Sequence, residues 1–417
     1  HIKKLLSYIN INLILIWRAM IRLSLCMIVK NEEVVLSRVL AIAIQFADEI
    51  LVADTGSTDR TVEIARTIHQ HIYHYPWNDD FAAARNFICE KVTTEYWMWL
   101  DADDVVPAES ITAILKLKET LSKSPQPDVD DENIAGFQPD GTPAFTYDRE
   151  RILRTDRHFL WKGRVHEAIA PRGRILYSPI QIEHRKPASA FTHSDRNLKI
   201  YETMLADGEL LDPRHQYYYA RELIDHKQYE KARPVLEHFL NEPDGWYENK
   251  ADAVCFWRAA MKYSENAASQ LSLFQSFLYD RPRAKTCCEI GRLKLSLGEI
   301  SQAVFWYQLA SKTDQNIIKA FIEADYYDFI PLIQLCVCYD RMGNYDKALY
   351  YHKETKKIRP DSPAVLTNEE YFQTNPQTIK QTDYLSCDIL SDLCGGLSGG
   401  LGVVPSSGIQ KQHALSL

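Results

Sequence analysis

YWMWLDADD, residues Tyr96–Asp104, is the stretch that decides how this chain folds. Its first part, Tyr96–Leu100, is wholly apolar and stops abruptly at Asp101, Asp103 and Asp104. A short apolar run with aromatic residues is typical of a buried strand in a parallel sheet. Ligands of open α/β sheets bind just beyond the carboxyl ends of such strands. The sequence therefore predicts a group of carboxylates at the binding edge of a sheet.

Asp101 and Asp103 are suited to hold one divalent cation. Alternate residues of an extended segment can point the same way, and carboxylates are hard oxygen donors that suit Mg²⁺ or Mn²⁺. A cation held there can in turn hold a diphosphate. The alternative interpretation is an acidic turn that ends the strand and caps a helix beginning near Pro107.

Strands and helices alternate four times near the start of the chain. The predicted strands are Ile21–Val29, Glu49–Asp54, Ile72–Tyr75 and Tyr96–Leu100. The predicted helices are Val34–Phe46, Thr61–His69, Asp80–Val92 and Glu109–Leu121. This alternation predicts an α/β fold with a doubly wound, Rossmann-like and mostly parallel sheet.

Three of these strands end in polar residues. KNEE (Lys30–Glu33) follows the first strand, Asp54 ends the second, and DADD (Asp101–Asp104) follows the fourth. Such ends lie along one edge of a parallel sheet, so a single crevice can collect Glu32, Asp54 and the aspartates. The chain has neither GxGxxG nor GxxxxGK[ST], so an NAD fingerprint and a P-loop are not indicated.

A series of motifs resembles family 2 glycosyltransferases of the GT-A fold. The motifs are, in order, CMIVKNEE, VADTGSTDRT, DFAAARN and WLDADD. DRERILR (Asp148–Arg154) and FLWKGRVHEAI (Phe159–Ile169) resemble more narrowly the bacterial branch that joins this domain to tetratricopeptide repeats. The peptide S- and O-glycosyltransferases that modify bacteriocins are similar to this branch. The resemblance covers about Ile21 to Phe372.

This resemblance implies roles on the nucleotide side of the site. Glu32 and Asp54 match positions that contact the ribose and base of a UDP-sugar. Lys30 stands where many relatives have an aromatic residue that contacts the base. Arg85 matches a basic position near the nucleotide.

The resemblance also implies a metal site. Asp101 would face the ribose and the metal, and Asp103 would bind the metal directly. His184 lies in IQIEHRK (Ile180–Lys186), a predicted late strand, where a histidine of GT-A enzymes can complete the metal site. The alternative is a histidine that is simply satisfied at a strand end.

GRVHEAI holds the predicted base of the reaction. An inverting sugar transfer needs a base that removes the acceptor's proton as the nucleophile attacks the anomeric carbon. Glu167 lies at a place comparable to the acidic base of other inverting members. His166 is the alternative base, because an imidazole titrates near neutral pH. The alternative for both residues is that they only cap and orient a loop. A thiol acceptor would need less help from a base than a hydroxyl, because part of it ionises near neutral pH.

The segment Ser122–Pro143 is rich in Pro, Asp and Gly, and this composition predicts a loop. Relatives usually have another strand there, so we expect a shortened sheet edge. The strand Ala144–Arg154 follows, and we expect most of its arginines to be solvated or paired, with one available to a diphosphate. We expect Trp161 to pack in the core, and the alternative is that it lines the sugar or acceptor pocket.

From Ser194 onward the chain is helical and rich in Tyr, Leu and Ala. Ala232, Ala268 and Ala303 recur at nearly the spacing of the roughly 34-residue tetratricopeptide unit. This predicts an all-α solenoid of three or four helix pairs, interrupted near Thr313–Tyr327. The concave face of such arrays commonly binds an extended peptide.

Composition bounds the class of protein. The 417 residues are 46% hydrophobic and 25% charged, as in ordinary soluble proteins, and the net charge of −8 argues against nucleic acid as the main partner. Nine cysteines without a CxxC pair or a Cys/His cluster of zinc spacing favour a reduced, cytoplasmic compartment. The stretch Leu5–Trp17 is too short and too polar for a membrane span and lacks a cleavage site of a secretion signal.

The sequence thus divides into four predicted parts. Residues 1–19 form an extension outside the fold, and Met20 is the natural start of the folded part. Residues 20–193 form the GT-A domain, residues 194–372 the tetratricopeptide-like domain, and residues 373–417 a Gly/Ser-rich flexible tail.

The prediction is a metal-dependent, inverting hexosyltransferase that uses Mg²⁺ or Mn²⁺ and a nucleotide-sugar donor, with UDP as the expected nucleotide. The expected acceptor is a peptide or protein at Cys, Ser or Thr. One alternative is a glycan or lipid-linked acceptor for surface polysaccharide, and another is a non-catalytic peptide-binding adaptor. Nucleotidyl transfer normally needs a basic Gly-rich turn after the first strand, which KNEE is not. The sugar, the linkage and the oligomeric state are not fixed by the sequence.

Overall fold

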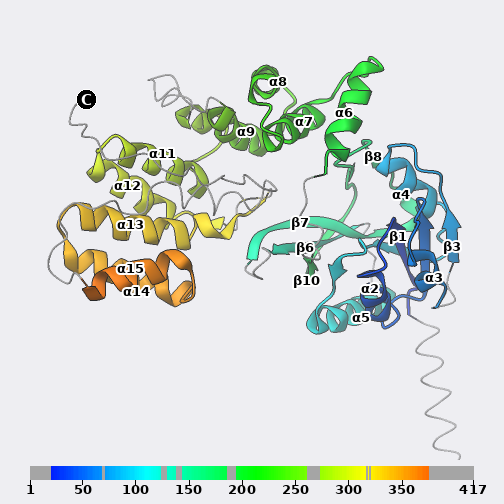
Figure 1. Cartoon of the computed structure of the whole chain (residues 1–417). Helices are drawn as coiled ribbons and strands as arrows, with labels where there is room; N and C mark the ends of the chain where they lie inside the picture. Colours follow the sequence, from blue (N-terminus) through cyan, green and yellow to red (C-terminus); the bar gives the residue numbers. More distant parts are fainter. Residues whose placement is uncertain are drawn as a thin grey trace, which may run out of the picture.

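The computed structural model describes residues 20–67, 71–123, 129–137, 143–185, 194–260, 273–315, 318 and 321–374. They form an α/β region followed by a helical region that curves away from it (Figure 1). The predicted extension, residues 1–19, and all but the first two residues of the predicted tail, residues 373–417, lie outside the described part of the chain. The predicted order of an α/β domain and then an all-α domain is confirmed.

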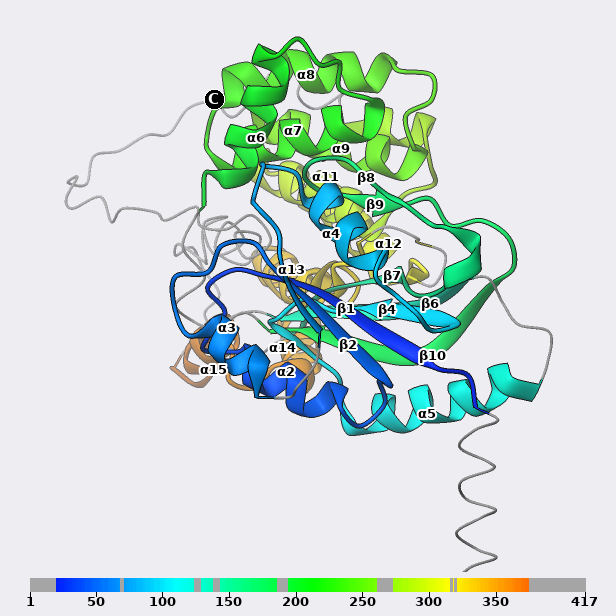
Figure 2. The ribbon, with the colours of Figure 1, turned by 90° about the vertical axis from the view of Figure 1, so that its right-hand side faces the viewer.

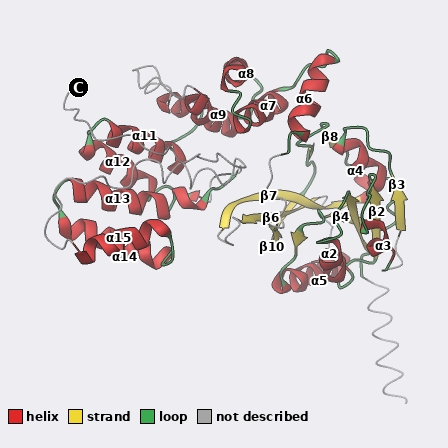
Figure 3. Ribbon diagram, in the orientation of Figure 1, coloured by secondary structure: helices red, strands yellow, loops and turns green. Residues whose placement is uncertain are grey.

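One large sheet organises the α/β region (Figure 3). Its strands are β1 (Leu23–Val29), β2 (Glu49–Asp54), β3 (His71–His74), β4 (Tyr96–Trp99), β5 (Asp104–Val105), β6 (Val129–Phe137), β7 (Pro143–Arg154) and β10 (Ile175–His184). They lie in the order β3-β2-β1-β4-β7-β6-β10-β5. A separate two-stranded sheet pairs β8 (Trp161–Lys162) with β9 (Ala168–Ile169).

The four strands predicted first, β1 to β4, pair in parallel. The register sets Val29 at the end of β1 beside Asp54 at the end of β2, and Cys26 beside Trp99 at the end of β4. The polar residues that follow these strands therefore meet at one edge of the sheet, as the sequence predicts.

The prediction of a loop over Ser122–Pro143 is wrong, because residues Val129–Phe137 form β6. This strand runs antiparallel to β7 on one side and parallel to β10 on the other. Asp, Asn and Gly disfavour strands when taken alone, but strand propensity depends strongly on context. Backbone hydrogen bonds to the strands on both sides stabilise β6 despite its unfavourable composition. The sheet is therefore not shortened here.

Helices cover both faces of the sheet (Figure 2). They are α2 (Leu36–Ala43), α3 (Thr61–Arg66), α4 (Phe81–Cys89) and α5 (Ala108–Lys123). The largest hydrophobic core joins β1, β2 and β4 to α2 and α5, while a second core on the other face joins the sheet to α4, β8 and β9. These are the four helices that the sequence predicts, with slightly different ends.

The helical region contains helices that pack in sequential pairs. They are α6 (Arg196–Ala206), α7 (Pro213–Asp225), α8 (Tyr229–Asn241), α9 (Tyr247–Ala260), α11 (Ala284–Ser296), α12 (Ile300–Ala310), α13 (Phe329–Arg341), α14 (Tyr345–Ile358) and α15 (Pro363–Thr374). Small residues allow the close crossings. Gly291 of α11 lies so near the Tyr307 ring of α12 that an added Cβ would approach it to 3.0 Å. Ala232, Ala303 and Ala348 are completely buried.

The segment that interrupts the helix pairs connects the two regions. Ile322 forms a bridge with Thr146 of β7, through two backbone hydrogen bonds of 2.9 and 2.8 Å. The ring of Phe321 packs on Phe145 and Tyr147, with centroids 5.5 and 4.6 Å away. This irregular segment of the helical region therefore packs directly against the sheet.

Two further findings concern the predicted location of the protein. Among the described residues, none of the helices combines the length and the apolar character that a membrane crossing requires. The described cysteines are all free thiols, and most of them are buried. The compartment of the protein stays a prediction.

Candidate active site

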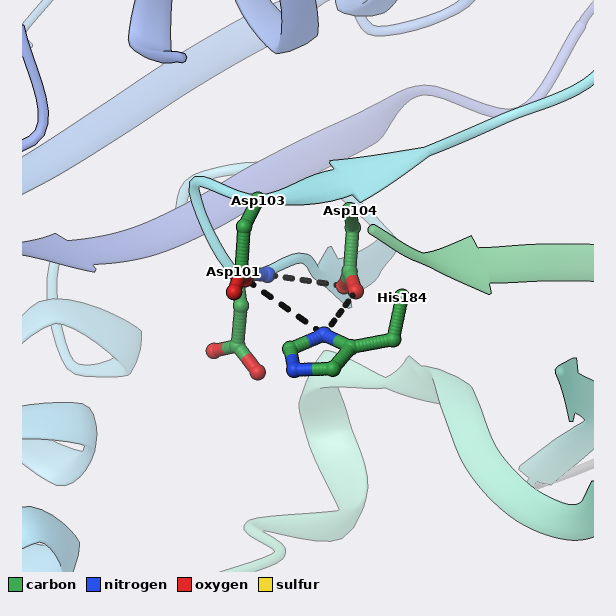
Figure 4. Close-up of side chains that lie close together, drawn as sticks. All are labelled: Asp101, Asp103, Asp104 and His184. Carbon is green, nitrogen blue, oxygen red and sulfur yellow. Dashed lines mark hydrogen bonds and ion pairs between the residues drawn. The ribbon is translucent and has the colours of Figure 1, made fainter. Parts of the chain in front are cut away.

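Four side chains gather at the carboxyl end of β4 (Figure 4). Asp101, Asp103, Asp104 and His184 each offer a ligand atom, and these atoms all lie within 4.8 Å of one another. The short strand β5 explains the arrangement, because it pairs with β10 and sets Asp104 beside His184. A two-residue ladder thus brings the late histidine beside the acidic stretch, and its role as a metal ligand stays a prediction.

Asp104 is the buried member of this cluster and contacts two of the other three residues. Its carboxylate is completely buried and pairs with the guanidinium of Arg151 at 2.9 Å. The same carboxylate accepts the backbone N–H of Asp101 at 2.9 Å and contacts Nδ1 of His184 at 3.0 Å. Asp104 therefore fixes the positions of two neighbours, and its own charge is balanced by Arg151.

His184 is oriented by two carboxylates. Nδ1 lies 3.0 Å from Asp104 and 3.4 Å from Asp103, so Nε2 is the ring nitrogen that takes no part in these two contacts (Figure 4). Desolvation alone would lower the pKa of His184, but the hydrogen bond to Asp104 and the charge of Asp103 outweigh it and raise the pKa. A histidine held by a carboxylate on one nitrogen while the other is left for an ion is the usual arrangement at metal sites.

The donor set fits a divalent cation. Asp101 and Asp103 supply carboxylate oxygens and His184 supplies an imidazole nitrogen, while Asp104 orients them. Desolvation raises the pKa of Asp101, but the charges of Arg85, Arg151 and His184 hold it well below its usual range, so this carboxylate is ionised at neutral pH. Carboxylates suit Mg²⁺ and Mn²⁺, and an imidazole favours the transition metal of the two.

An open cavity of about 360 Å³ lies in front of the cluster. This volume falls within the range of small-molecule binding sites. Eight of the predicted site residues line the cavity, namely Lys30, Glu32, Arg85, Asp101, Asp103, His166, Glu167 and His184.

Asp54 is the predicted site residue outside the set that lines this cavity. Its carboxylate accepts the backbone N–H groups of Gly56 at 3.2 Å and Ser57 at 3.1 Å, which holds the turn after β2. A role of Asp54 in contacting the nucleotide stays a prediction.

The KNEE loop is tied to that same turn. Asn31 adopts a left-handed φ of 57°, and its side-chain oxygen accepts the backbone N–H of Thr58 at 2.8 Å. Glu32 donates its own backbone N–H to Thr61 at 2.7 Å. Partial desolvation, followed by the charges of Asp103 and Asp101, raises the pKa of Glu32 to about 7.

Arg85 connects the predicted base to the metal cluster. Its Nε donates to Glu167 at 2.7 Å and its terminal nitrogen donates to Asp101 at 2.8 Å. The guanidinium lies over the rings of Trp99 and Trp161, 4.9 and 4.8 Å from their centroids, and the two rings contact each other edge to face. Trp161 is buried in the core, as expected. Arg85 thus binds the carboxylates of Glu167 and Asp101 at the same time.

His166, the alternative base, packs against α7 of the helical region. It has a left-handed φ of 51° and stacks on Tyr218 of α7 at 4.4 Å between centroids. Its Nε2 lies 2.8 Å from the carboxylate of Glu222. Burial lowers the pKa of His166 despite this carboxylate, so the imidazole is neutral at pH 7. A neutral ring that donates through Nε2 would retain a basic Nδ1.

The arginines of β7 are paired, as expected for most of them. Arg151 binds Asp104, and Arg154 binds the exposed Asp156. Arg149 lies 3.1 Å from Glu150 and donates to the backbone oxygen of Glu167 at 3.0 Å.

Arg196 and Asn197 were not recognised in the sequence. Both line the cavity from the first turn of α6, beyond the predicted end of the catalytic domain at residue 193. They follow a segment with no motif, so only the three-dimensional packing brings them to the site.

The fold and this site define a class of protein. Residues 24–170 match the family model described as glycosyl transferase family 2. The α/β region is therefore similar to a family 2 glycosyltransferase domain over residues 24–170, and it is joined here to a helical region.

Two curated proteins are similar to parts of this chain. A TPR repeat-containing protein of Synechococcus elongatus is 43% identical over 96 residues, which are 23% of this chain and 24% of that protein. The SPbeta prophage-derived glycosyltransferase SunS of Bacillus subtilis is 28% identical over 176 residues, 42% of this chain and 37% of SunS. The chain thus spans less than two-fifths of the length of either relative.

A crystal structure of S. aureus TarS residues 1–349 with UDP-GlcNAc aligns with a TM-score of 0.33 and 13% identity, over 82% of this chain and 93% of that one. A likeness of this size carries no conclusion about substrates.

Proposed function

We propose that this chain is a metal-dependent inverting glycosyltransferase that moves a sugar from a UDP-sugar to Cys, Ser or Thr of a peptide or protein. The observation that carries the proposal is the cavity in which one arginine, Arg85, joins Glu167 to Asp101 of the metal cluster. A candidate base and a candidate cation site thus lie on either side of a single guanidinium. A displacement at a sugar carbon needs a base for the acceptor and positive charge beside the leaving group, and candidates for both line this cavity.

Asp101, Asp103 and His184 would hold the ion, and Lys30 and Glu32 line the cavity where the nucleotide would lie. A bound Mn²⁺ or Mg²⁺ supplies positive charge that offsets the negative charge growing on the diphosphate. Arg85 keeps the Asp101 carboxylate ionised and in place, because the ion pair lowers the pKa of that group. These residues prepare the leaving-group side of the reaction.

The acceptor's oxygen or sulfur would attack the anomeric carbon while the bond from that carbon to the diphosphate breaks. The electron pair of the broken bond stays on the phosphate oxygen of UDP, and the acceptor's proton passes to the base. Glu167 is the proposed base. Its carboxylate forms an ion pair with Arg85 and its side chain is only 12% exposed, so the carboxylate is held in one position. His166, oriented by Glu222, is the alternative.

A polypeptide acceptor is supported by the helical region. Its paired helices stack into an array, and arrays of this type offer extended concave surfaces to peptides. The array also packs directly against the catalytic domain, through Ile322 on Thr146 and His166 on Tyr218. A peptide that binds the array would therefore lie close to the cavity.

The test is release of UDP from UDP-sugars in the presence of Mn²⁺, with and without peptides that contain Cys, Ser or Thr. We expect Asp103→Ala to lower the rate at least a hundredfold, and Asp156→Ala, which removes an exposed carboxylate outside the cavity, to leave it unchanged. Turnover that accelerates only with saccharide or lipid acceptors would refute the peptide assignment. Full activity of the Glu167→Gln variant would rule out Glu167 as the base and favour His166.

A further inference from the structure

Arg196 brings a positive charge from the helical region into the cavity. It opens α6, the first helix of that region, and it lines the same cavity as Asp101 and Asp103. Its guanidinium lies over the ring of Phe81, 4.6 Å from the centroid, and Phe81 also lines the cavity. The side chain is therefore laid along one wall of the cavity.

A hydrogen-bonded chain fixes this end of α6. Asn197, the next residue, donates to the carboxylate of Glu222 on α7 at 3.1 Å. Glu222 is 9% exposed and also contacts His166 of the catalytic domain at 2.8 Å. The start of α6 is thus tied to α7 and to the loop that carries the predicted base.

The charge of Arg196 is not neutralised in the way that the charge of Arg85 is. Arg85 forms ion pairs of 2.7 and 2.8 Å with two carboxylates. Within the described ranges, Arg196 forms no ion pair shorter than 4.0 Å, and its Nε donates weakly to Asn197 at 3.4 Å. Glu32, Glu167, Glu222 and Asp101 act on it only through space. A guanidinium in such a position can still take up an anion.

We propose that Arg196 binds the diphosphate of the nucleotide sugar, so that the helical region supplies part of the donor site. This rests on the proposed function, since it assumes a nucleotide-diphosphate donor. A planar guanidinium matches phosphate oxygens with two parallel hydrogen bonds, which a lysine cannot reproduce. The helical region would then be needed for donor binding even in the absence of an acceptor.

The experiment measures binding to the full chain in the presence of Mn²⁺, with UDP by titration calorimetry and uridine by ligand-observed NMR. The variants are Arg196→Ala, Arg196→Lys and the control Lys199→Ala. Lys199 lies one turn further along α6, its side chain is 72% exposed, and it does not line the cavity. The control removes the same unit of charge from the same helix.

We expect Arg196→Ala to weaken UDP binding about tenfold to hundredfold, Arg196→Lys to weaken it less, and Lys199→Ala to leave it unchanged. Uridine, which lacks the diphosphate, should bind the wild type and Arg196→Ala equally. Equal loss of uridine and UDP, or unchanged UDP binding in Arg196→Ala, would overturn the inference. A wild type that binds no UDP at all would overturn the proposed donor itself, and the inference with it.

Discussion

Asp104 and Arg151 illustrate how single residues hold the site in shape. The carboxylate of Asp104 is fully buried and the side chain of Arg151 is 2% exposed. Arg151 also donates to the backbone oxygen of Trp99 at 3.0 Å and lies over the Trp99 ring at 3.6 Å from the centroid. The pair thus anchors both the end of β4 and the carboxylate that orients His184.

Arg151→Ala should lower the free energy of unfolding by about 3–5 kcal/mol, because it leaves the Asp104 carboxylate buried without its partner. Arg154→Ala is the matched control, since its partner Asp156 has a side chain that is 63% exposed, and it should cost no more than about 1 kcal/mol. Urea denaturation of the two variants measures the difference. Equal losses of unfolding free energy in the two variants would show that the buried pair contributes no more to stability than the exposed pair.

Glu32 makes a prediction about pH. Its pKa of about 7 in the folded protein lies above the ordinary 4.5, so folding favours the protonated form. The resulting stability is complete at pH values below about 4.5 and is lost as the pH rises toward 7. Glu32→Gln, which cannot ionise, should therefore stabilise the metal-free protein by about 1–2 kcal/mol at pH 8, after allowance for solvent screening, and leave it unchanged at pH 4.5. Denaturation in EDTA at both pH values tests this, and a gain at pH 4.5 alone would contradict it.

The loop of residues 163–167, between β8 and β9, is the element through which the helical region contacts the chemistry. Gly163 has a φ of 96°, and a Cβ added there would lie 2.3 Å from Nε2 of His215 on α7. His166 stacks on Tyr218 one turn later on the same helix. The face of α7 therefore determines the conformation of the loop that presents Glu167.

Gly163→Ala should destabilise the protein by about 2–4 kcal/mol, because it adds a steric clash to the cost of a left-handed backbone. Gly208→Ala supplies the control, since Gly208 has a φ of 80° but open space around its Cβ position, and it should cost only about 1–2 kcal/mol. Thermal and urea unfolding give the comparison. A Gly163→Ala variant as stable as Gly208→Ala would mean that loop and helix separate easily.

At the scale of the whole molecule, the sequence predicts those features that local residues determine. The stretch Tyr96–Asp104 predicts a buried strand that ends at the binding edge of the sheet. The regular spacing of small residues in the second half predicts the helix pairs. β6 was missed because its pairing with β7 and β10 outweighs an unfavourable composition. The position of Arg196 at the cavity was missed because it comes from the packing of α6 against α7 and the catalytic domain, which no local pattern encodes.

The donor set of the whole site predicts a preference among metals. Two carboxylates and an imidazole nitrogen suit Mn²⁺ better than Mg²⁺, which favours oxygen ligands. EDTA should abolish turnover, and Mn²⁺ should restore it at a lower concentration than Mg²⁺. His184→Ala should weaken Mn²⁺ binding about tenfold or more, which calorimetry can measure. Full activity in EDTA would contradict a metal-dependent reaction.

The measurement that tests the central claim most directly is NMR of the full chain turning over a UDP-α-sugar in the presence of Mn²⁺. It follows UDP release and the anomeric configuration of the new product in one experiment. We predict a β-configured product from the wild type and no product from Asp103→Ala. A product that keeps the α configuration would contradict the inverting mechanism, and no turnover of any nucleotide sugar with any acceptor would contradict the assignment of this cavity as a transferase site.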